Sequence, residues 1–241
     1  MNVGKFGLKP VIERPKLKLS QYVDAAKLPV INSPVRWTMA LMTDWGMMGN
    51  DSVGDCFWAA AAHAFMTWTA NSGIQASFTD QQVLAAYSAA TGYDPSDPAT
   101  DQGTDLIQGM NFLKKTGIAG YKTGPYIEVP LDDMQLVHSA HWIFGGMLVG
   151  VEFHKDWEQR VIWDISSSPV LGGHMVYSGD YFTGPDKLGI VTWGEDRFLT
   201  TAALKAYGVA IVTVPEAWIA DNGLAPSGFA LQDLLADEAK L

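Results

Sequence analysis

A change in the spacing of hydrophobic residues near the middle of the chain restricts the fold more than any other feature. In the first half, apolar residues recur at helical spacing, and helices are expected over residues 57–70, 79–90 and 104–116. In the second half, short runs rich in β-branched and aromatic residues predict strands at 146–153, 175–182, 189–193 and 209–214. This order predicts an α+β protein, with a helical N-terminal half packed against a strand-rich C-terminal half and a cleft between them.

The net charge of -10 is distributed unevenly along the 241 residues. Residues 1–28 hold six basic and two acidic residues, a charge of +4, and the remaining chain is acidic. Pro10 and Pro15 favour an extended conformation, so we expect a basic arm that docks onto the acidic body or onto a protein assembly partner. An acidic body repels phosphate, and the arm has no glycine-rich RNA motif, which argues against nucleic-acid binding.

The composition and the residues that interrupt helices and strands indicate the domain organisation. Hydrophobic residues make up 48% and charged residues 17% of the chain, as in globular proteins. We expect an arm over residues 1–28, one domain over 29–219 and a tail over 220–241 that forms a short helix from residue 230. No signal-peptide pattern and no apolar run of membrane-spanning length is visible, which predicts a soluble protein that does not bind membranes.

Neither a metal nor a cofactor is expected from the motifs. The single cysteine and the scattered histidines lack the paired spacing of metal ligands, and no glycine-rich phosphate loop is present. Three aspartates lie between residues 93 and 103, but their spacing differs from that of a helix–loop–helix calcium site. A solvated loop is the favoured interpretation of that segment.

Cys56 is the only cysteine in the chain, so it forms no internal disulfide. It follows the glycine turn at Gly54 and stands at the first turn of the alanine-rich helix. Unpartnered backbone N–H groups and the helix dipole favour a thiolate there, which lowers the pKa of a thiol and makes it a nucleophile. A buried structural cysteine is the alternative.

A thiolate nucleophile needs a base, and His174 is the favoured histidine of the five. His63 lies about 10 Å along the helix axis from Cys56, too far for contact. His138, His141 and His154 are more typical of structural histidines. His174 instead follows two glycines at the start of a predicted strand, where the backbone can be approached closely.

Several segments, in the same order along the chain, resemble the papain-like cysteine peptidases. Residues 50–64 are similar to the nucleophile segment, with an amide side chain six residues before the cysteine, a glycine turn and a helix. Further similar segments are 34–37, 78–84, 145–151, Gly173-His174-Met175-Val176 and Val191-Thr192-Trp193-Gly194. The resemblance spans roughly residues 29–219 and is greatest to divergent members from bacteriophages and bacteria.

The resemblance implies a papain-like fold whose central helix carries Cys56. It implies that Cys56 is the nucleophile, that His174 is its base, and that Asn50 and the Cys56 N–H form an oxyanion hole. Such a site hydrolyses peptide or isopeptide amides through a thioester. The family orients its histidine with an asparagine, but Val191 stands at that position. Thr192 or Asp180 is expected to substitute.

Two functions follow from these residues, and both stay open. The first is a cysteine hydrolase acting on a peptide or protein substrate, in a cytoplasmic or phage-associated setting. The second is a catalytically silent component, for example of a virion, whose basic arm clamps a neighbour. An acyl transferase of the transglutaminase kind ranks third. Residues 1–28 are either a remnant of an inhibitory pro-segment or a permanent strap, and their short length favours the strap.

Overall fold

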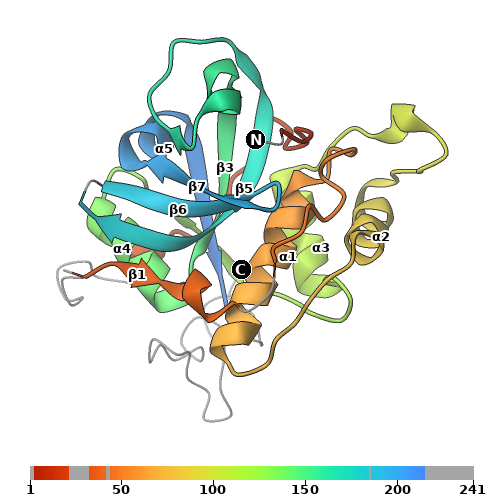
Figure 1. Ribbon diagram of the computed structural model, residues 1–241. Helices are drawn as coiled ribbons and strands as arrows, with labels where there is room; N and C mark the ends of the chain where they lie inside the picture. Colours follow the sequence, from red (N-terminus) through yellow and green to blue (C-terminus); the bar gives the residue numbers. More distant parts are fainter. Residues whose placement is uncertain (1–2, 22–32, 42–43, 185, 215–241) are drawn as a thin grey trace.

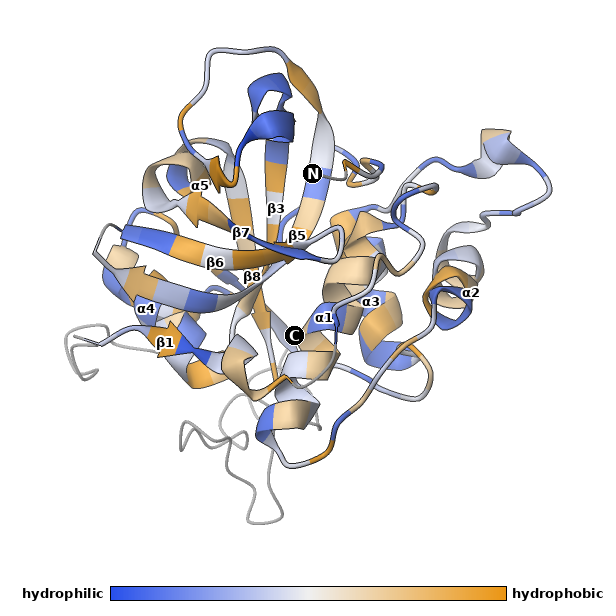
Figure 2. Ribbon diagram, in the orientation of Figure 1, coloured by the Kyte–Doolittle hydropathy of each residue, from blue (hydrophilic) through white to orange (hydrophobic). Residues whose placement is uncertain are grey.

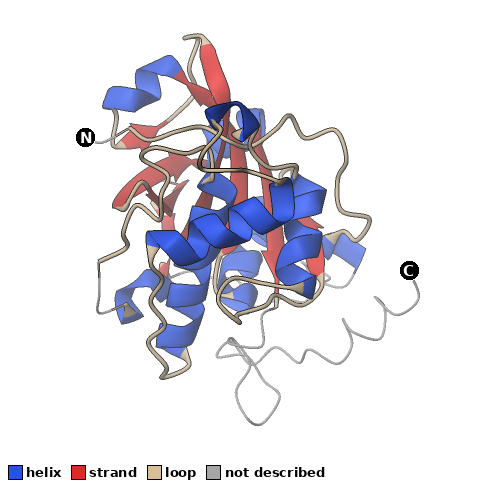
Figure 3. Ribbon diagram, turned by 90° about the vertical axis from the view of Figure 1, so that its right-hand side faces the viewer, coloured by secondary structure: helices blue, strands red, loops and turns tan. Residues whose placement is uncertain are grey.

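The computed structural model describes residues 3–21, 33–41, 44–184 and 186–214, which form two halves. Helices α1 (Cys56–Asn71), α2 (Asp80–Thr91) and α3 (Leu106–Lys115) lie on one side, and most of the strands lie on the other (Figure 1). In the turned view of Figure 3, helices stand in front of the sheet. The predicted α+β arrangement is confirmed. The expected helix from residue 230 lies outside the described residues.

Helix α1 is the central element of the helical half. Its residues from Cys56 to Thr69 are all buried, because alanines allow the neighbouring elements to approach closely. Helix α2 begins with a capping box, in which Thr79 and Gln82 exchange hydrogen bonds. Helix α3 starts two residues later than predicted, because the Asp105 side chain caps it by accepting from the Gln108 N–H.

One eight-stranded sheet forms most of the second half, in the order β2-β8-β3-β5-β6-β7-β4, with β1 paired to β5. The strands are β1 (Val35–Arg36), β2 (Tyr126–Val129), β3 (Met147–His154), β4 (Ile162–Trp163), β5 (Val170–Thr183), β6 (Asp186–Thr192), β7 (Glu195–Thr200) and β8 (Gly208–Thr213). Neighbouring strands are antiparallel except β4 and β7. Hydrophobic residues line the central strands (Figure 2).

The strand-rich half also contains helices that the spacing of apolar residues does not predict. These are α4 (Met134–Phe144) and α5 (Thr201–Tyr207). Short 3-10 helices are η1 (Leu19–Gln21), η3 (Trp37–Ala40), η4 (Pro98–Thr100) and η5 (Lys155–Gln159). Among the described residues, no helix combines the length and the apolar character needed to cross a bilayer.

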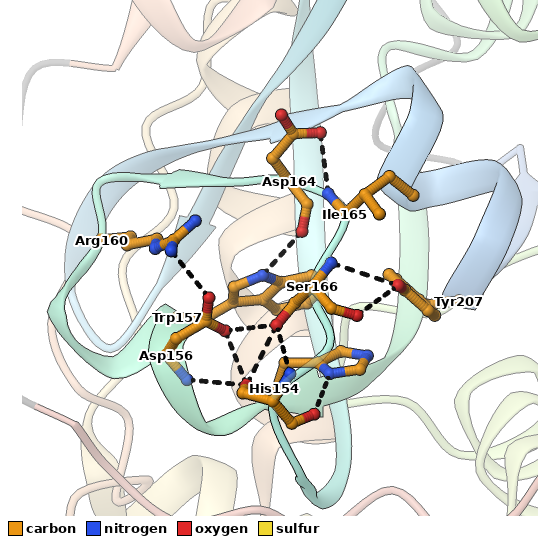
Figure 4. A network of polar contacts seen from close by, with 9 residues as sticks. His154, Asp156, Trp157, Arg160, Asp164, Ile165, Ser166 and Tyr207 are labelled. Atoms are coloured by element: carbon orange, nitrogen blue, oxygen red, sulfur yellow. Dashed lines mark hydrogen bonds and ion pairs between the residues drawn. The ribbon is translucent and has the colours of Figure 1, made fainter.

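A polar network fixes the long connection between β4 and β5 (Figure 4). The Asp156 carboxylate accepts hydrogen bonds from the hydroxyls of Ser166 and Ser168 and pairs with Arg160 at 2.9 Å. The Tyr207 hydroxyl donates to the Ser166 carbonyl at 2.8 Å. These contacts hold the connection against η5 and α5, and thereby fix the start of β5, the strand that carries His174.

The described part of the basic arm lies on its own chain. Near its C-terminal end, Glu128 of β2 pairs with both Arg14, at 2.7 Å, and Lys18. The Glu128 N–H also donates to the Leu17 carbonyl at 3.0 Å. The expected docking of a positively charged arm onto the acidic body is therefore found. A clamp onto a neighbouring molecule stays a prediction.

Candidate active site

Cys56, at the start of α1, contacts the backbone of β5 directly after His174. The N–H of Met175, the residue after His174, lies 3.4 Å from the Cys56 sulfur. Both side chains are almost completely buried, each 1% exposed. The start of α1 and strand β5 are thus in contact at Cys56 and Met175.

Burial is the main influence on the pKa of the Cys56 thiol. It raises the pKa of Cys56 to about 12, although backbone N–H groups of Met175, Gly7 and Phe57 act in the opposite direction. The neighbouring Asp55, itself fully buried, adds to the increase. The thiolate expected from the helix terminus alone is thus absent in this closed state, because desolvation outweighs the helix dipole.

His174 is held by a hydrogen bond on one ring nitrogen and by aromatic rings on its faces and edges. Its Nε2 lies 2.7 Å from Thr192 Oγ1, and the Trp193 ring stacks on the imidazole at 4.5 Å between centroids. Trp193 occupies the turn between β6 and β7 with φ 50°, an uncommon conformation for a bulky residue. Nδ1 has no hydrogen-bond partner among the described residues and is the nitrogen left to accept a proton.

The environment of His174 favours neutral imidazole. Burial, and then the positive charge of Arg197, lower the pKa of His174 to about 3. The Arg197 guanidinium is buried and lies 5.1 Å from the centre of the Trp193 ring. With these pKa values Cys56 is a thiol and His174 is a neutral imidazole near neutral pH.

Of the two candidates for the orienting residue, only Thr192 contacts the histidine. Asp180 accepts hydrogen bonds from the N–H and hydroxyl of Thr38, and it lies six residues further along β5. Val191 is buried in the hydrophobic cluster that includes Cys56. Side chains alternate along a strand, which explains why Thr192, rather than Val191, reaches His174.

Asn50 faces the arm. Its Nδ2 donates to the Lys5 carbonyl at 3.1 Å and to the Val53 carbonyl at 2.9 Å, and the Lys5 N–H donates to the Asn50 carbonyl at 2.7 Å. The side chain is 1% exposed. The amide selected as an oxyanion donor thus binds a carbonyl of an extended peptide, although that peptide belongs to the same chain.

The arm continues across the thiol between two backbone edges. Gly173 accepts from the N–H groups of Gly7 and Leu8, at 3.2 and 3.0 Å. On the other side, Thr104 donates to the Gly7 carbonyl at 2.7 Å and accepts from the Lys9 N–H at 3.0 Å. A Cβ on Gly7 would lie 1.8 Å from the Gly54 carbonyl oxygen, so only glycine fits there. Leu8 thus forms isolated bridges to both Thr104 and Gly173, and this part of the arm lies between the segment that precedes α3 and strand β5.

The other histidines have structural contacts, as the sequence suggests. His63 Nε2 bonds the Gly46 carbonyl at 3.1 Å, and His141 bonds Ser178 at 2.8 Å. His154 Nδ1 bonds the Ser168 carbonyl, and His138 packs on the Tyr181 ring. A role that the sequence analysis missed is that of Asp101, whose carboxylate receives the Gly54 N–H at the nucleophile turn.

A comparison with solved structures finds similarity to papain-like cysteine proteases. Xylellain, a cysteine protease from Xylella fastidiosa, superposes with a TM-score of 0.67 at 16% identity, covering 88% of this chain and 96% of that one. ProCathepsin B S9 from Trypanosoma congolense gives 0.64 at 8% identity, with 88% and 86% covered. Bromelain from Ananas comosus, in complex with the E64 inhibitor, gives 0.57 at 14% identity, with 78% and 99% covered.

These similarities show that the chain has a papain-like fold. No protein-family model matches the chain, and no curated protein matches its sequence. The predicted fold is thus confirmed, whereas the roles of Cys56, His174 and Asn50 stay proposals.

The lowered pKa of His174 predicts a measurable acid dependence of stability. The unfolded chain binds a proton at this residue below its ordinary pKa of about 6.5, whereas the folded chain binds none until about pH 3. Folding stability therefore falls as the pH decreases across this window, by about 1.4 kcal/mol per pH unit for one histidine. His174→Gln should make the slope shallower by that amount, as measured by urea unfolding from pH 6.5 to 4.5.

The difference between the slopes of parent and variant isolates His174, because the other titrating groups contribute equally to both proteins. Asp55 and Asp180 have raised pKa values because they are buried, and they act in the opposite direction in both proteins. Parallel slopes for parent and variant would contradict the buried neutral state of His174.

Proposed function

We propose that this protein is a latent cysteine peptidase whose active site is closed by its own N-terminal arm. The observation that carries the proposal is the position of the arm. Asn50 binds the Lys5 carbonyl while Gly173 and Thr104 bind the backbone around Gly7, directly over Cys56. A site that holds an extended peptide over a thiol and an imidazole has the components for peptide hydrolysis.

The chemistry follows from these atoms. Once the cleft is open to water, Cys56 loses its proton to Nδ1 of His174, while Nε2 stays bonded to Thr192. The sulfur attacks a substrate carbonyl carbon, and the resulting oxyanion is stabilised by the Asn50 amide and the Cys56 N–H. The imidazolium then protonates the leaving amine, and water hydrolyses the thioester to release the acid and restore the thiol.

Latency follows from burial by the arm. The pKa of Cys56, about 12, and that of His174, about 3, oppose formation of the ion pair while residues 4–9 occupy the cleft. Removal of these residues takes away the Gly7 backbone beside the Cys56 thiol and the Phe6 ring, 5.9 Å from the His174 ring, and should thereby reduce the desolvation that causes the shifts. One of the similar solved structures is itself a procathepsin, which is consistent with a closed state of this kind.

A chain that begins at residue 13 tests the proposal, because it lacks the cleft segment and keeps Arg14 and Lys18 on Glu128. We expect it to hydrolyse fluorescein-labelled casein at least tenfold faster than the full chain, and Cys56→Ser should abolish this activity. Circular dichroism and thermal melting establish that the shortened chain is folded. A folded chain with a Cys56 that reacts with iodoacetamide but no hydrolysis would refute peptidase activity.

The second candidate is a catalytically silent papain-fold component. The observation that favours it is the uncharged state of both Cys56 and His174, with pKa values that oppose an ion pair. This function predicts a Cys56 thiol that reacts slowly with iodoacetamide at pH 7, even after the arm is removed. The phage-associated setting and the transglutaminase-like alternative stay hypotheses.

A further inference from the structure

Asp101 connects a surface loop to the turn that precedes the nucleophile. Both of its carboxylate oxygens receive the Gly54 N–H, at 3.2 and 3.0 Å, and Gly54 stands two residues before Cys56. A Cβ on Gly54 would lie 2.9 Å from Asp101 Oδ1, so the carboxylate is in direct contact with the backbone of the turn. Hydrogen bonds to a charged acceptor are stronger than those between neutral groups.

Tyr87 extends this connection into the helical half. Its hydroxyl donates to Asp101 Oδ1 at 2.6 Å and accepts the Gly103 N–H at 2.9 Å. Tyr87 is fully buried in α2, and burial together with Asp101 raises its pKa, so the hydroxyl keeps its proton. Gly54, Asp101, Tyr87 and Gly103 thus form one chain of hydrogen bonds, which we name the Asp101–Tyr87 brace.

The brace ends at the backbone edge that holds the extended peptide. Thr104, next to Gly103, makes the two backbone hydrogen bonds to the arm at Gly7 and Lys9. Thr104 Oγ1 also accepts from Trp58 Nε1 at 2.9 Å. Residues two positions before and two positions after Cys56 are therefore tied to the same peptide-binding edge.

We propose that Asp101 and Tyr87 are positioning residues that fix the Cys56 turn relative to the peptide-binding edge at Gly103 and Thr104. The inference rests on the proposed peptidase function and deepens it. A chain with one cysteine has no disulfide with which to join these two segments. The brace joins them with a carboxylate and a phenol instead, and holds the nucleophile at a fixed place beside a bound carbonyl.

Tyr87→Phe tests the inference, because it removes one hydroxyl and both of its hydrogen bonds. The matched control is Tyr93→Phe, since the Tyr93 ring stacks on Tyr87 at 4.9 Å but its hydroxyl bonds none of the described residues. Both substitutions are made in the full chain and in full-length Gly7→Val, in which a Cβ over the Gly54 carbonyl displaces the arm.

Two reagents separate thiol chemistry from peptide positioning in the Gly7→Val proteins. Iodoacetamide reports the reactivity of the thiol, and E-64, the inhibitor bound by bromelain, also requires the peptide-binding edge. Tyr87→Phe should reduce the maximal rate of inactivation by E-64 about tenfold and change the iodoacetamide rate less than twofold. Tyr93→Phe should change neither rate. Unchanged E-64 kinetics, or an equal decrease with both reagents, would overturn the inference.

Amide hydrogen exchange in the full chain gives an answer that is independent of catalysis. Tyr87→Phe should accelerate exchange at Gly103, its direct partner, and at Gly54, which it reaches only through Asp101. If exchange of the Gly54 N–H stays unchanged, Tyr87 does not stabilise the Gly54 turn through Asp101, and the brace is refuted. If Gly7→Val reacts with iodoacetamide but never with E-64, the proposed function fails, and Gly54 exchange still decides whether the brace forms.

Discussion

Full-length Gly7→Val should raise casein hydrolysis at least ~10-fold over the parent chain. The Cβ of any residue at position 7 would lie 1.8 Å from the Gly54 carbonyl oxygen and 2.8 Å from the Gly54 Cα. Both atoms belong to the backbone of the nucleophile turn, so no side-chain rotation relieves the clash. Overpacking typically costs about 1–3 kcal/mol, and a clash with backbone atoms lies at the upper end, so the population of the closed arm should fall ~10- to 100-fold.

Gly184→Val is the control for Gly7→Val, because a Cβ there meets no heavy atom within 4 Å. It should leave hydrolysis at the parent level. Gly7→Val should also melt at a lower temperature. Leu8 is only 6% exposed, and its side chain loses this burial when the arm is displaced. A Gly7→Val protein that stays folded while its Cys56 remains as unreactive as in the parent would show that the arm is not the barrier.

The sequence predicts those parts of the fold that depend on residues close together in the chain. The starts of α1 and α2 depend on residues within one helical turn, and the helices expected over 57–70 and 79–90 agree with the structure to within one residue at each end. Helix α4 has equally local signals, an Asp133 N-cap and a Gly145 C-cap in the left-handed conformation, and the sequence analysis overlooked them. Strand β5 begins before the predicted residue because its pairing with β3 continues through Gly172 and Gly173.

The site depended more on long-range packing. The glycine pair marks His174, whose neighbour Met175 contacts Cys56, but the choice between Thr192 and Asp180 requires the strand register. The pKa of Cys56 was expected to fall because local helix geometry favours a thiolate, whereas the arm buries the thiol and reverses the shift. Nothing in the local pattern around Gly7 shows that this glycine lies against a turn 47 residues away.

In the Gly7→Val protein, Thr192→Val should lower kcat for casein about 100-fold with little change in KM. Valine has the shape of threonine without the hydroxyl, so His174 Nε2 loses the hydrogen-bond partner that lies 2.7 Å away. The imidazole then has no hydrogen bond to fix its tautomer and its orientation, so the proposed proton transfer from Cys56 to Nδ1 becomes less frequent. Substrate contacts at Gly173 and Thr104 stay intact, which is why KM is expected to change little.

Thr192→Ser distinguishes this role from packing, because serine keeps the hydroxyl and loses only a methyl group. Serine at position 192 should retain kcat within about fivefold of the parent, whereas valine does not. The stacked Trp193, at 4.5 Å, continues to hold the ring plane in both variants, so the difference between them measures the hydrogen bond. Equal kcat values for Thr192→Val and Thr192→Ser would mean that the aromatic rings alone orient His174, and that Thr192 does not replace the family's asparagine.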